Sequence, residues 1–247
     1  MDHIKLLEVV TDGAIADRTS KSLHPSALRG CDRKALLSAL EYKKTHPMDT
    51  KLKWKLNRFG TYEGLFKRGF EALAAKHTLD VREQLELRLG SFHGYVDFAL
   101  LGQNENIYIE VKSSAPSAFS KGSMPYPAHV AQAQAYYIMA HESDAPDKPT
   151  QVLLLYVSRW YEGKMPIFRT YDVTPSDEEY EEMLSYMGVL EEYKRNEALP
   201  TVPFSHSEEH PFLCRRKNWK KKDSEGNPET EVSCEYYSHC WAAELPL

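Results

Sequence analysis

The sequence has no hydrophobic run long enough to cross a membrane. Its longest purely apolar stretch covers residues 152–157, whereas a membrane-spanning helix needs about 18 such residues. No basic flank leads into an apolar stretch at residues 1–5, so a signal peptide is not expected. Internal repeats and long low-complexity segments are also missing, and 247 residues are enough to bury a core. We therefore expect a globular intracellular protein, cytoplasmic, or in the host cytoplasm if the chain is viral.

An excess of basic residues is missing as well, because the formal net charge is -5 at pH 7. This balance argues mildly against nucleic-acid binding, which usually needs a basic surface. The charges are unevenly placed, however, with acidic residues crowded into residues 177–192 and a basic run near the C-terminus. That run comprises Arg215, Arg216, Lys217, Lys220, Lys221 and Lys222. We predict that it contacts the DNA backbone; the alternative is an ordinary solvated surface.

The first eighty residues are expected to be mainly helical, with one helix over residues 26–40 and another over residues 61–76. The pattern changes at Gln84, after which leucine alternates with charged residues at the period of a half-buried strand. Turn-forming residues separate this strand from two more, over residues 92–101 and 107–112. Together the three predict an antiparallel meander.

The second half continues the alternation of helices and strands. A helix is expected over residues 129–141, with strands following over residues 151–158 and 167–173. Thr174, with Pro175 after it, looks like the N-cap of a last long helix. The chain is thus predicted to be one α/β domain, a central mixed sheet flanked by helices. Its expected parts are a helical part (residues 1–82), a core (83–173) and a C-terminal helix with a cysteine-bearing flap (174–247).

The second and third strands are expected to place two carboxylates opposite each other. If their turn centres between residues 103 and 104, residues whose numbers sum to 207 face each other, and 97 + 110 = 207 pairs Asp97 with Glu110. Lys112 shares the face of Glu110, because side chains two apart in a strand point the same way. The opposite face is hydrophobic and consists of Phe98, Leu100, Ile109 and Val111.

Carboxylates this close repel each other unless a cation lies between them, and hard oxygen ligands suit Mg²⁺ or Mn²⁺. Such an ion can orient a phosphate and activate a bound water, and a nearby lysine can assist that water. The alternative is a cross-strand cluster of Asp97, Glu110 and Lys112 on a solvated sheet face.

Two helices add polar groups to faces that should be hydrophobic. Glu63 lies in line with Phe66 and Phe70, and a half-buried acid normally needs a partner. On the later helix, one stripe that should be hydrophobic holds two or three polar groups; it comprises His129, Gln132, Tyr136 and Met139. The alternative for Gln132 is an amide that the backbone satisfies.

These residues resemble the motifs of PD-(D/E)XK nucleases of the RecB type. Residues 94–97 (Gly-Tyr-Val-Asp) resemble the GxxD motif, and residues 109–112 (Ile-Glu-Val-Lys) resemble (D/E)XK. Residues 132–136 (Gln-Ala-Gln-Ala-Tyr) resemble QxxxY, and the order and spacing agree over about residues 55–140. The resemblance implies a restriction-endonuclease-like core and a metal-dependent DNA exonuclease acting on single-stranded ends.

The resemblance also implies a role for each matched residue. The implied ligands of the Mg²⁺ or Mn²⁺ ion are Asp97, Glu110, Glu63 and the carbonyl of Val111. Lys112 would orient or activate the attacking water, and Gln132 and Tyr136 would position the DNA strand. Implied partners are DNA and proteins of DNA repair, recombination or CRISPR adaptation.

The sequence departs from the family motifs at two positions. Val96 replaces the proline before the aspartate, and Gly64 stands where the family's GxxxH motif has histidine. Glu63, one residue earlier, is the candidate to replace that histidine. The glycine keeps a second function open, that of a catalytically inactive DNA-binding subunit of a DNA-processing complex. A third is a structural protein with a zinc staple.

The chain has only four cysteines: Cys31, Cys214, Cys234 and Cys240. In an intracellular chain such a cluster suggests a metal rather than disulfides. It resembles the iron–sulfur module of Cas-four-type CRISPR exonucleases and of the AddB nuclease domain, which implies a [4Fe–4S] cluster that staples the flap to the core. The alternatives are zinc, with His206, His210 or His239 as substitute ligands, and four unligated buried cysteines. The long stretch between Cys214 and Cys234 is expected to be a surface loop.

Overall fold

The computed structural model describes residues 21–45, 61–158, 166–200, 215–222, 228–232, 236 and 240. For residues 61–65, 215–222 and 228–232 it describes the backbone alone.

Helices and strands alternate along most of this chain. The helices are η1 (Pro25–Ala27), α2 (Asp32–Ala39), α4 (Thr61–His77), α5 (Pro116–Ser120), α6 (Pro127–Glu142) and α7 (Asp177–Arg195). The strands are β1 (Asp80–Leu89), β2 (Phe92–Leu101), β3 (Asn106–Ser114), β4 (Gln151–Ser158), β5 (Phe168–Asp172), β6 (Arg215–Lys222) and β7 (Pro228–Val232).

The centre of the molecule is a five-stranded sheet in the order β1-β2-β3-β4-β5. Neighbouring strands are antiparallel except β3 and β4, which run parallel because α6 carries the chain across between them. Phe98 pairs with Ile109 and Leu101 with Asn106, so the predicted sum of 207 is the register of the β2–β3 hairpin. The α/β class, the mixed sheet and the antiparallel meander are confirmed.

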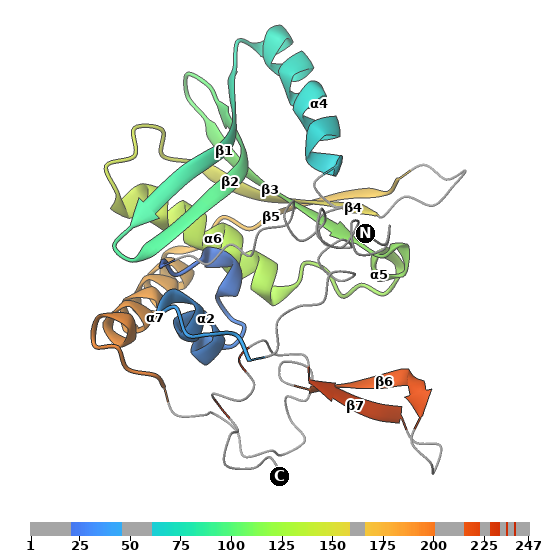
Figure 1. Ribbon diagram of the computed structural model, residues 1–247. Coiled ribbons are helices and arrows are strands. Elements are labelled where there is room, and N and C mark those ends of the chain that lie inside the picture. The colour runs from blue at the N-terminus through green and yellow to red at the C-terminus, as the bar shows by residue number, and fades with distance from the viewer. Residues whose placement is uncertain are drawn as a thin grey trace, which may run out of the picture.

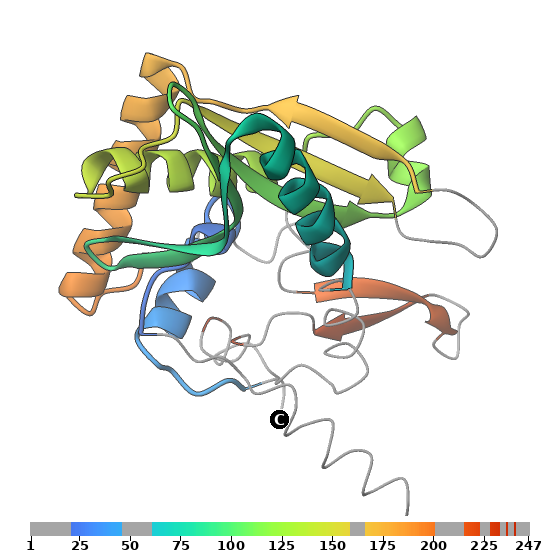
Figure 2. The same cartoon turned by 90° about the horizontal axis from the view of Figure 1, so that it is seen from above.

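Helix α4 covers one face of the sheet, as Figure 1 and Figure 2 show. Phe98, Leu100 and Ile109 are buried there, and Phe66 and Phe70 of α4 pack against them. The rings of Phe70 and Phe98 lie 4.9 Å apart. The side chains that alternate toward α4 are therefore hydrophobic, as the strand pattern predicted.

Helix α6 lies across the other face (Figure 1). Helices η1 and α7 pack against it, and α2 packs against η1 and α7. Ala133, Ala135 and Ala140 of α6 have no exposed surface and let neighbouring elements approach closely. Ile138 and Met139 are fully buried as well. A helix this enclosed holds its polar side chains inside the molecule.

Helix α7 begins two residues later than the sequence predicted. Its N-cap is Ser176, which forms a capping box with Glu179. Thr174 is not available for this role, because its hydroxyl accepts from the Val152 amide at 3.0 Å and donates to Asp172 at 2.7 Å. The expected repeat along the helix is confirmed, since Met183, Met187 and Leu190 are buried.

Three other expectations about secondary structure are wrong. The helix expected over residues 26–40 is two pieces, η1 and α2, because Arg29 between them takes a left-handed backbone with φ 55°. Strand β1 begins at Asp80 rather than at Gln84. The stretch expected to be a surface loop holds the antiparallel pair β6 and β7.

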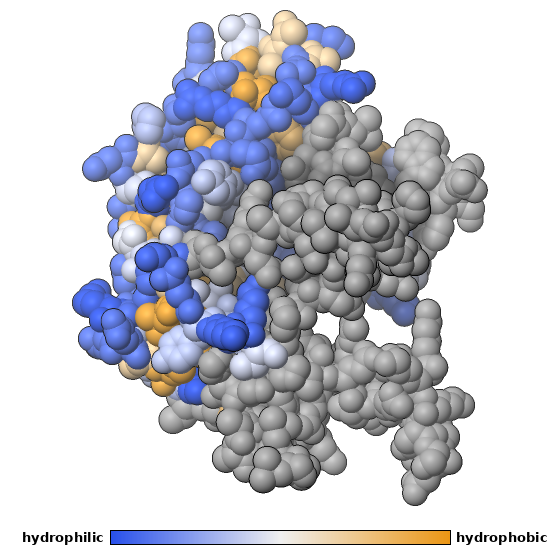
Figure 3. All heavy atoms as spheres, in the orientation of Figure 1, coloured by the Kyte–Doolittle hydropathy of each residue, from blue (hydrophilic) through white to orange (hydrophobic). Residues whose placement is uncertain are grey.

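The visible described surface is mostly hydrophilic, with hydrophobic residues scattered singly or in small groups (Figure 3). Within the described ranges, no helix is both long and apolar enough to cross a membrane.

Candidate active site

The regular pairing of strands β1 and β2 is interrupted at Gln84 and Asp97, where both strands twist about their own axes. Regular pairing is present on either side, at Glu83 with Phe98 and at Leu85 with Val96. Val96 packs in the core under α6, whereas Phe98, two residues on, packs under α4. Gln84 takes a left-handed backbone with φ 48°. A regular strand would keep residues two apart on one face, so the strand turns about its own axis at Asp97.

The turn at Asp97 directs its carboxylate toward β3. Asp97 Oδ2 accepts the backbone amide of Val111 at 2.8 Å, and Gln84 Nε2 donates to Oδ1 at 3.3 Å. The Val111 amide therefore donates to the side chain of Asp97, beyond the last backbone pair of β2 and β3, Phe98 with Ile109. This contact brings Asp97 to the part of β3 that carries Glu110 and Lys112.

Glu110 is 4% exposed and is held on one oxygen only. Its Oε1 accepts from Lys112 Nζ at 2.7 Å and from Gln132 Nε2 at 2.7 Å. Its Oε2 is buried and receives no well-formed hydrogen bond from the residues that the structure describes, although the backbone amide of Asp97 lies near the carboxylate and lowers its pKa. A buried carboxylate oxygen without a donor is costly, so this atom is a position where a cation fits.

Gln132 connects the sheet to α6. Its Oε1 accepts from Lys112 Nζ at 2.7 Å, while its Nε2 donates to Glu110 and, at 3.1 Å, to the Tyr136 hydroxyl. The amide is therefore satisfied by side chains of the predicted cluster, which excludes the alternative of a backbone-satisfied glutamine. The structure brings together five of the predicted site residues: Asp97, Glu110, Lys112, Gln132 and Tyr136.

Gly94 leaves room for Tyr136. A Cβ atom at this position would lie 2.7 Å from Tyr136 Cε1 and 3.1 Å from Pro25 Cδ. The backbone of Tyr95 also hydrogen-bonds to the Tyr136 hydroxyl. The first residue of the GxxD-like stretch thus touches the last residue of the QxxxY-like stretch.

Burial is the largest influence on the pKa values of both carboxyl groups, Asp97 and Glu110. It raises the pKa of Glu110 to about 8, although the charge of Lys112 opposes this shift. Burial also raises the pKa of Asp97, against the hydrogen bond from Val111. The raised pKa favours the neutral form of Glu110 at neutral pH, and a bound cation would reverse that preference.

The donor set fits a hard divalent cation held by few protein ligands. Among the described residues there is no group of three or more histidine, cysteine, aspartate or glutamate side chains that could hold a metal. Mg²⁺ often uses only one or two carboxylates and keeps several waters. Asp97 and the unpartnered Oε2 of Glu110 supply such a pair.

Several predicted site residues fall outside the described atoms. The backbone of α4 includes Glu63 in its first turn, but its side chain is not described. The same holds for the basic side chains of β6. Cys214 and Cys234 lie outside the described residues altogether.

The other two cysteines lie near one helix. Cys31 is the N-cap residue of α2, and Cys240 packs against a small cluster formed by Leu37 of α2 and Tyr236. The chain near residue 240 therefore lies against α2, almost the length of the sequence away.

Sequence reasoning missed two residues that complete the site. Gln84 contacts Asp97, and the β1–β2 hairpin register, in which paired numbers sum to 181, could have located it. Tyr156 is the β4 neighbour of Lys112, and no sequence signal gives the parallel register that places it there.

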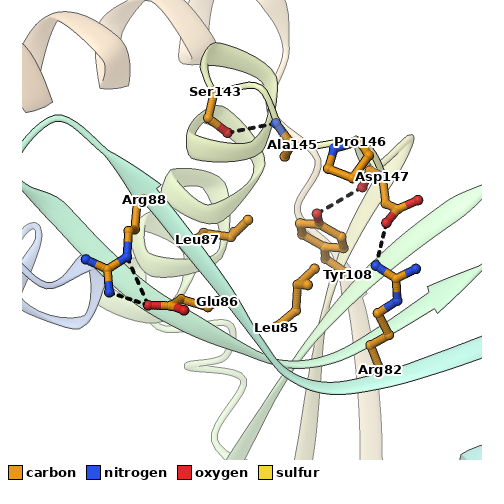
Figure 4. Close-up of a pocket in the computed structure, with 10 residues that line it drawn as sticks. All are labelled: Arg82, Leu85, Glu86, Leu87, Arg88, Tyr108, Ser143, Ala145, Pro146 and Asp147. Carbon is orange, nitrogen blue, oxygen red and sulfur yellow. Dashed lines mark hydrogen bonds and ion pairs between the residues drawn. The ribbon is translucent and has the colours of Figure 1, made fainter.

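A pocket of about 240 Å³ lies elsewhere, between β1 and the loop after α6 (Figure 4). Tyr108 donates to the Asp147 carbonyl at 2.9 Å, and Arg82 pairs with the Asp147 carboxylate at 2.6 Å. Its rim at Ser143 is eleven residues from Gln132, roughly 16 Å along the helix axis. Its charges are paired with one another, so we assign it no part in the chemistry.

No protein-family model matches the chain, and no curated protein sequence matches it. Among solved structures it is similar to the crystal structure of SSO0001, at 16% identity and a TM-score of 0.46, over 79% of this chain and 86% of that one. It is also similar to an alkaline exonuclease, LHK-Exo, from Laribacter hongkongensis, at 11% identity and a TM-score of 0.43, over 76% and 97% of the two chains. The complex of LHK-Exo with dAMP gives 13% identity and a TM-score of 0.39, over 72% and 93%. Similarities of this size do not assign a chemistry.

Proposed function

We propose that this protein is a metal-dependent DNA exonuclease that hydrolyses phosphodiester bonds at single-stranded ends. The observation that carries the proposal is the largely buried hydrogen-bonded network of Glu110, Lys112, Gln132 and Tyr136, beside which the Val111 amide holds Asp97. One carboxylate oxygen in it, Glu110 Oε2, has no partner among the described residues. An ordinary sheet surface would leave such groups in water.

Asp97 and Glu110 would hold the Mg²⁺ or Mn²⁺ ion, with the Val111 carbonyl and Glu63 as further ligands. When bound, the ion would lower the pKa of a coordinated water and stabilise charge on the leaving oxygen. Gln84 and the Val111 amide fix the Asp97 carboxylate from two sides. The ligands are therefore oriented before substrate arrives.

Lys112 would orient the attacking water. An ammonium group has three protons, and in the described part of the chain two of them go to Glu110 and Gln132. The third remains for a water or a phosphate oxygen. Glu110 and Gln132 thus fix the orientation of the Lys112 ammonium group, and its third N–H would be available to the reaction.

Gln132 and Tyr136 would act by holding this arrangement. Both Nε2 protons of Gln132 are used inside the network, and the side chain is buried. Tyr136, 4% exposed, receives one of those protons. We therefore propose that Gln132 positions Lys112 and Glu110, and that Tyr136 positions Gln132 beside the bound DNA strand.

We propose further that the four cysteines hold a [4Fe–4S] cluster, with zinc as the alternative occupant. The placement of Cys31 at the start of α2, and of Cys240 against the same helix, supports a staple at this position. Iron and sulfide analysis of anaerobically purified protein, with its visible absorption spectrum, distinguishes the two. A colourless protein that contains zinc would remove the cluster from the proposal.

The activity is tested with anaerobically purified protein and single-stranded DNA labelled at the 5′ or the 3′ end. Wild type, Asp97→Ala and Lys112→Ala are compared in Mn²⁺, Mg²⁺ and EDTA. Glu83→Gln serves as the matched control, because this acid lies on β1 outside the network and pairs with Lys67. Metal-dependent loss of label in wild type and the control alone is the expected result, and it also gives the polarity of digestion.

A catalytically inactive DNA-binding subunit is the second candidate, favoured by Gly64 in place of a histidine. That protein would bind Mn²⁺ and single-stranded DNA, and it would leave both labels intact in every condition.

A further inference from the structure

His129 lies in the first turn of α6, three residues before Gln132 and therefore on the same side of the helix. Its Nδ1 is 2.8 Å from the hydroxyl of Tyr156, the residue that pairs with Lys112 across the parallel strands. The backbone amide of Tyr126 donates to the same hydroxyl oxygen at 3.1 Å. Tyr156 thus connects His129 to the strand that lies beside Lys112 in the sheet.

These two contacts fix the tautomer of the imidazole. The Tyr156 oxygen accepts the Tyr126 proton, so its own single proton is left to donate. Tyr156 is fully buried, and among the described residues His129 Nδ1 is the only acceptor in reach. If Nδ1 carried a proton instead, the tyrosine proton would be buried without an acceptor. Nδ1 is therefore the acceptor, and the imidazole proton is on Nε2.

The ring is neutral at physiological pH. Burial, followed by the charge of Lys112, lowers the pKa of His129 to about 4. A neutral Nε2–H is a hydrogen-bond donor that adds no charge beside the lysine.

His129 as a whole is only partly buried. The described residues provide no hydrogen-bond partner for its Nε2, and this atom is not among their buried unsatisfied atoms. The imidazole is therefore held at one nitrogen and leaves the other, protonated one available near Lys112.

We propose that His129 donates its Nε2–H to a non-bridging phosphate oxygen of the bound strand, and that Tyr156 is the positioning residue that sets this tautomer. The assignment of the ligand rests on the proposed function, because it takes the phosphodiester as substrate. The ammonium of Lys112 and the imidazole of His129 would then approach the phosphate as one cationic and one neutral donor.

The tautomer is tested without DNA, by long-range ¹H–¹⁵N correlation spectra of protein labelled at histidine. The expected pattern for His129 is a protonated Nε2 and an unprotonated Nδ1, with His129→Gln used to assign the signal. Tyr156→Phe should convert it to a mixture of tautomers. A protonated Nδ1 in wild type would overturn the inference.

The phosphate contact is tested by fluorescence anisotropy with a single-stranded oligonucleotide, with Ca²⁺ in place of Mn²⁺ to prevent cleavage. His129→Leu should weaken binding about tenfold, whereas His129→Gln, whose amide can place a donor near the position of Nε2, should stay within about threefold of wild type. The slope of log Kd against log salt should be the same in all three proteins, because a neutral donor releases no counterion. Loss of a cationic contact would change it by about 0.7.

The matched control is His141→Gln on the same helix, whose imidazole contacts the Pro149 carbonyl at 2.9 Å and which should bind DNA as wild type does. Equal binding by His129→Leu and wild type would overturn the phosphate contact while the proposed function stands. Failure of wild type itself to bind DNA would overturn both, and the spectra would still report on the tautomer.

Discussion

The two faces of the central sheet are built from the same strands, but they differ in what they contribute. Under α4, Phe98, Leu100 and Ile109 form a purely hydrophobic contact with the helix. Under α6, their sequence neighbours Asp97 and Glu110 bring charge into the interior. Both faces stabilise the fold by burying hydrophobic side chains, but the α6 face also buries carboxylates, and their burial lowers the free energy of unfolding unless something neutralises them.

This contrast teaches where to look for function. Burial of hydrophobic side chains is favourable in itself, whereas burial of a glutamate with an unpartnered oxygen is costly and needs a reason. Groups of this kind persist at sites where a ligand or a reaction uses them.

Asp97→Asn should produce the largest effect, a loss of DNA cleavage of about a thousandfold or more. The asparagine carbonyl can still accept the Val111 amide, so the fold should be retained, but the charge that holds the metal is lost. Cleavage of end-labelled DNA is measured beside thermal unfolding. A variant that cleaves at the wild-type rate would show that the α6 face has no catalytic role.

Phe98→Ala should show the opposite behaviour on the α4 face. Removing this buried ring, which is 1% exposed, should lower the free energy of unfolding by about 3–5 kcal/mol. Urea denaturation measures the loss, and cleavage per folded molecule should change little at low temperature. A loss below about 1 kcal/mol would mean that α4 does not pack on the sheet as described.

The stability of the metal-free protein should depend on pH through Glu110. Its pKa is 4.5 in a free side chain and about 8 when folded, so the folded state binds the proton more tightly. The resulting stabilisation is fully present below about pH 4.5 and is lost as pH rises through about 8, at about 1.4 kcal/mol per pH unit. Urea titrations in EDTA, with Glu110→Gln to isolate this group, measure the slope. An identical pH dependence in the two proteins would contradict the assignment.

Gly94→Ala should have the smallest effect of the four, about 1–3 kcal/mol of stability, because the added methyl group overlaps the Tyr136 ring. Displacement of Tyr136 should also reduce kcat through Gln132, with little change in KM. Gly69→Ala is the control, because nothing lies within 4 Å of a Cβ atom there. Equal stability and kcat in the two variants would remove Tyr136 from the network.

The sequence predicted most of the sheet because its information is local. Alternating side chains and a turn centred between residues 103 and 104 determine the β2–β3 register, which is observed from Phe98 with Ile109 to Leu101 with Asn106. The expected pair of Asp97 and Glu110 lies one position beyond the end of this ladder. The rotation of the strands at Gln84 could not be predicted, since a left-handed backbone at glutamine has no sequence signal. Tyr156 was missed because its place beside Lys112 follows from a crossover. The N-cap was misassigned because Thr174 hydrogen-bonds to the nearby Asp172 and to the Val152 amide of β4, which is distant in sequence.

The central claim is that the α6 face is a metal site, and thermal unfolding of wild type and Glu110→Gln at pH 8, with Mn²⁺ and with EDTA, tests it most directly. In EDTA, Glu110→Gln should be the more stable protein, because the buried carboxyl no longer ionises on unfolding. Mn²⁺ should raise the Tm of wild type and leave that of Glu110→Gln nearly unchanged, since binding to the folded state alone stabilises it. A Glu110→Gln protein that is less stable in EDTA, together with a wild type indifferent to Mn²⁺, would contradict the account and make Glu110 only the structural partner of Lys112.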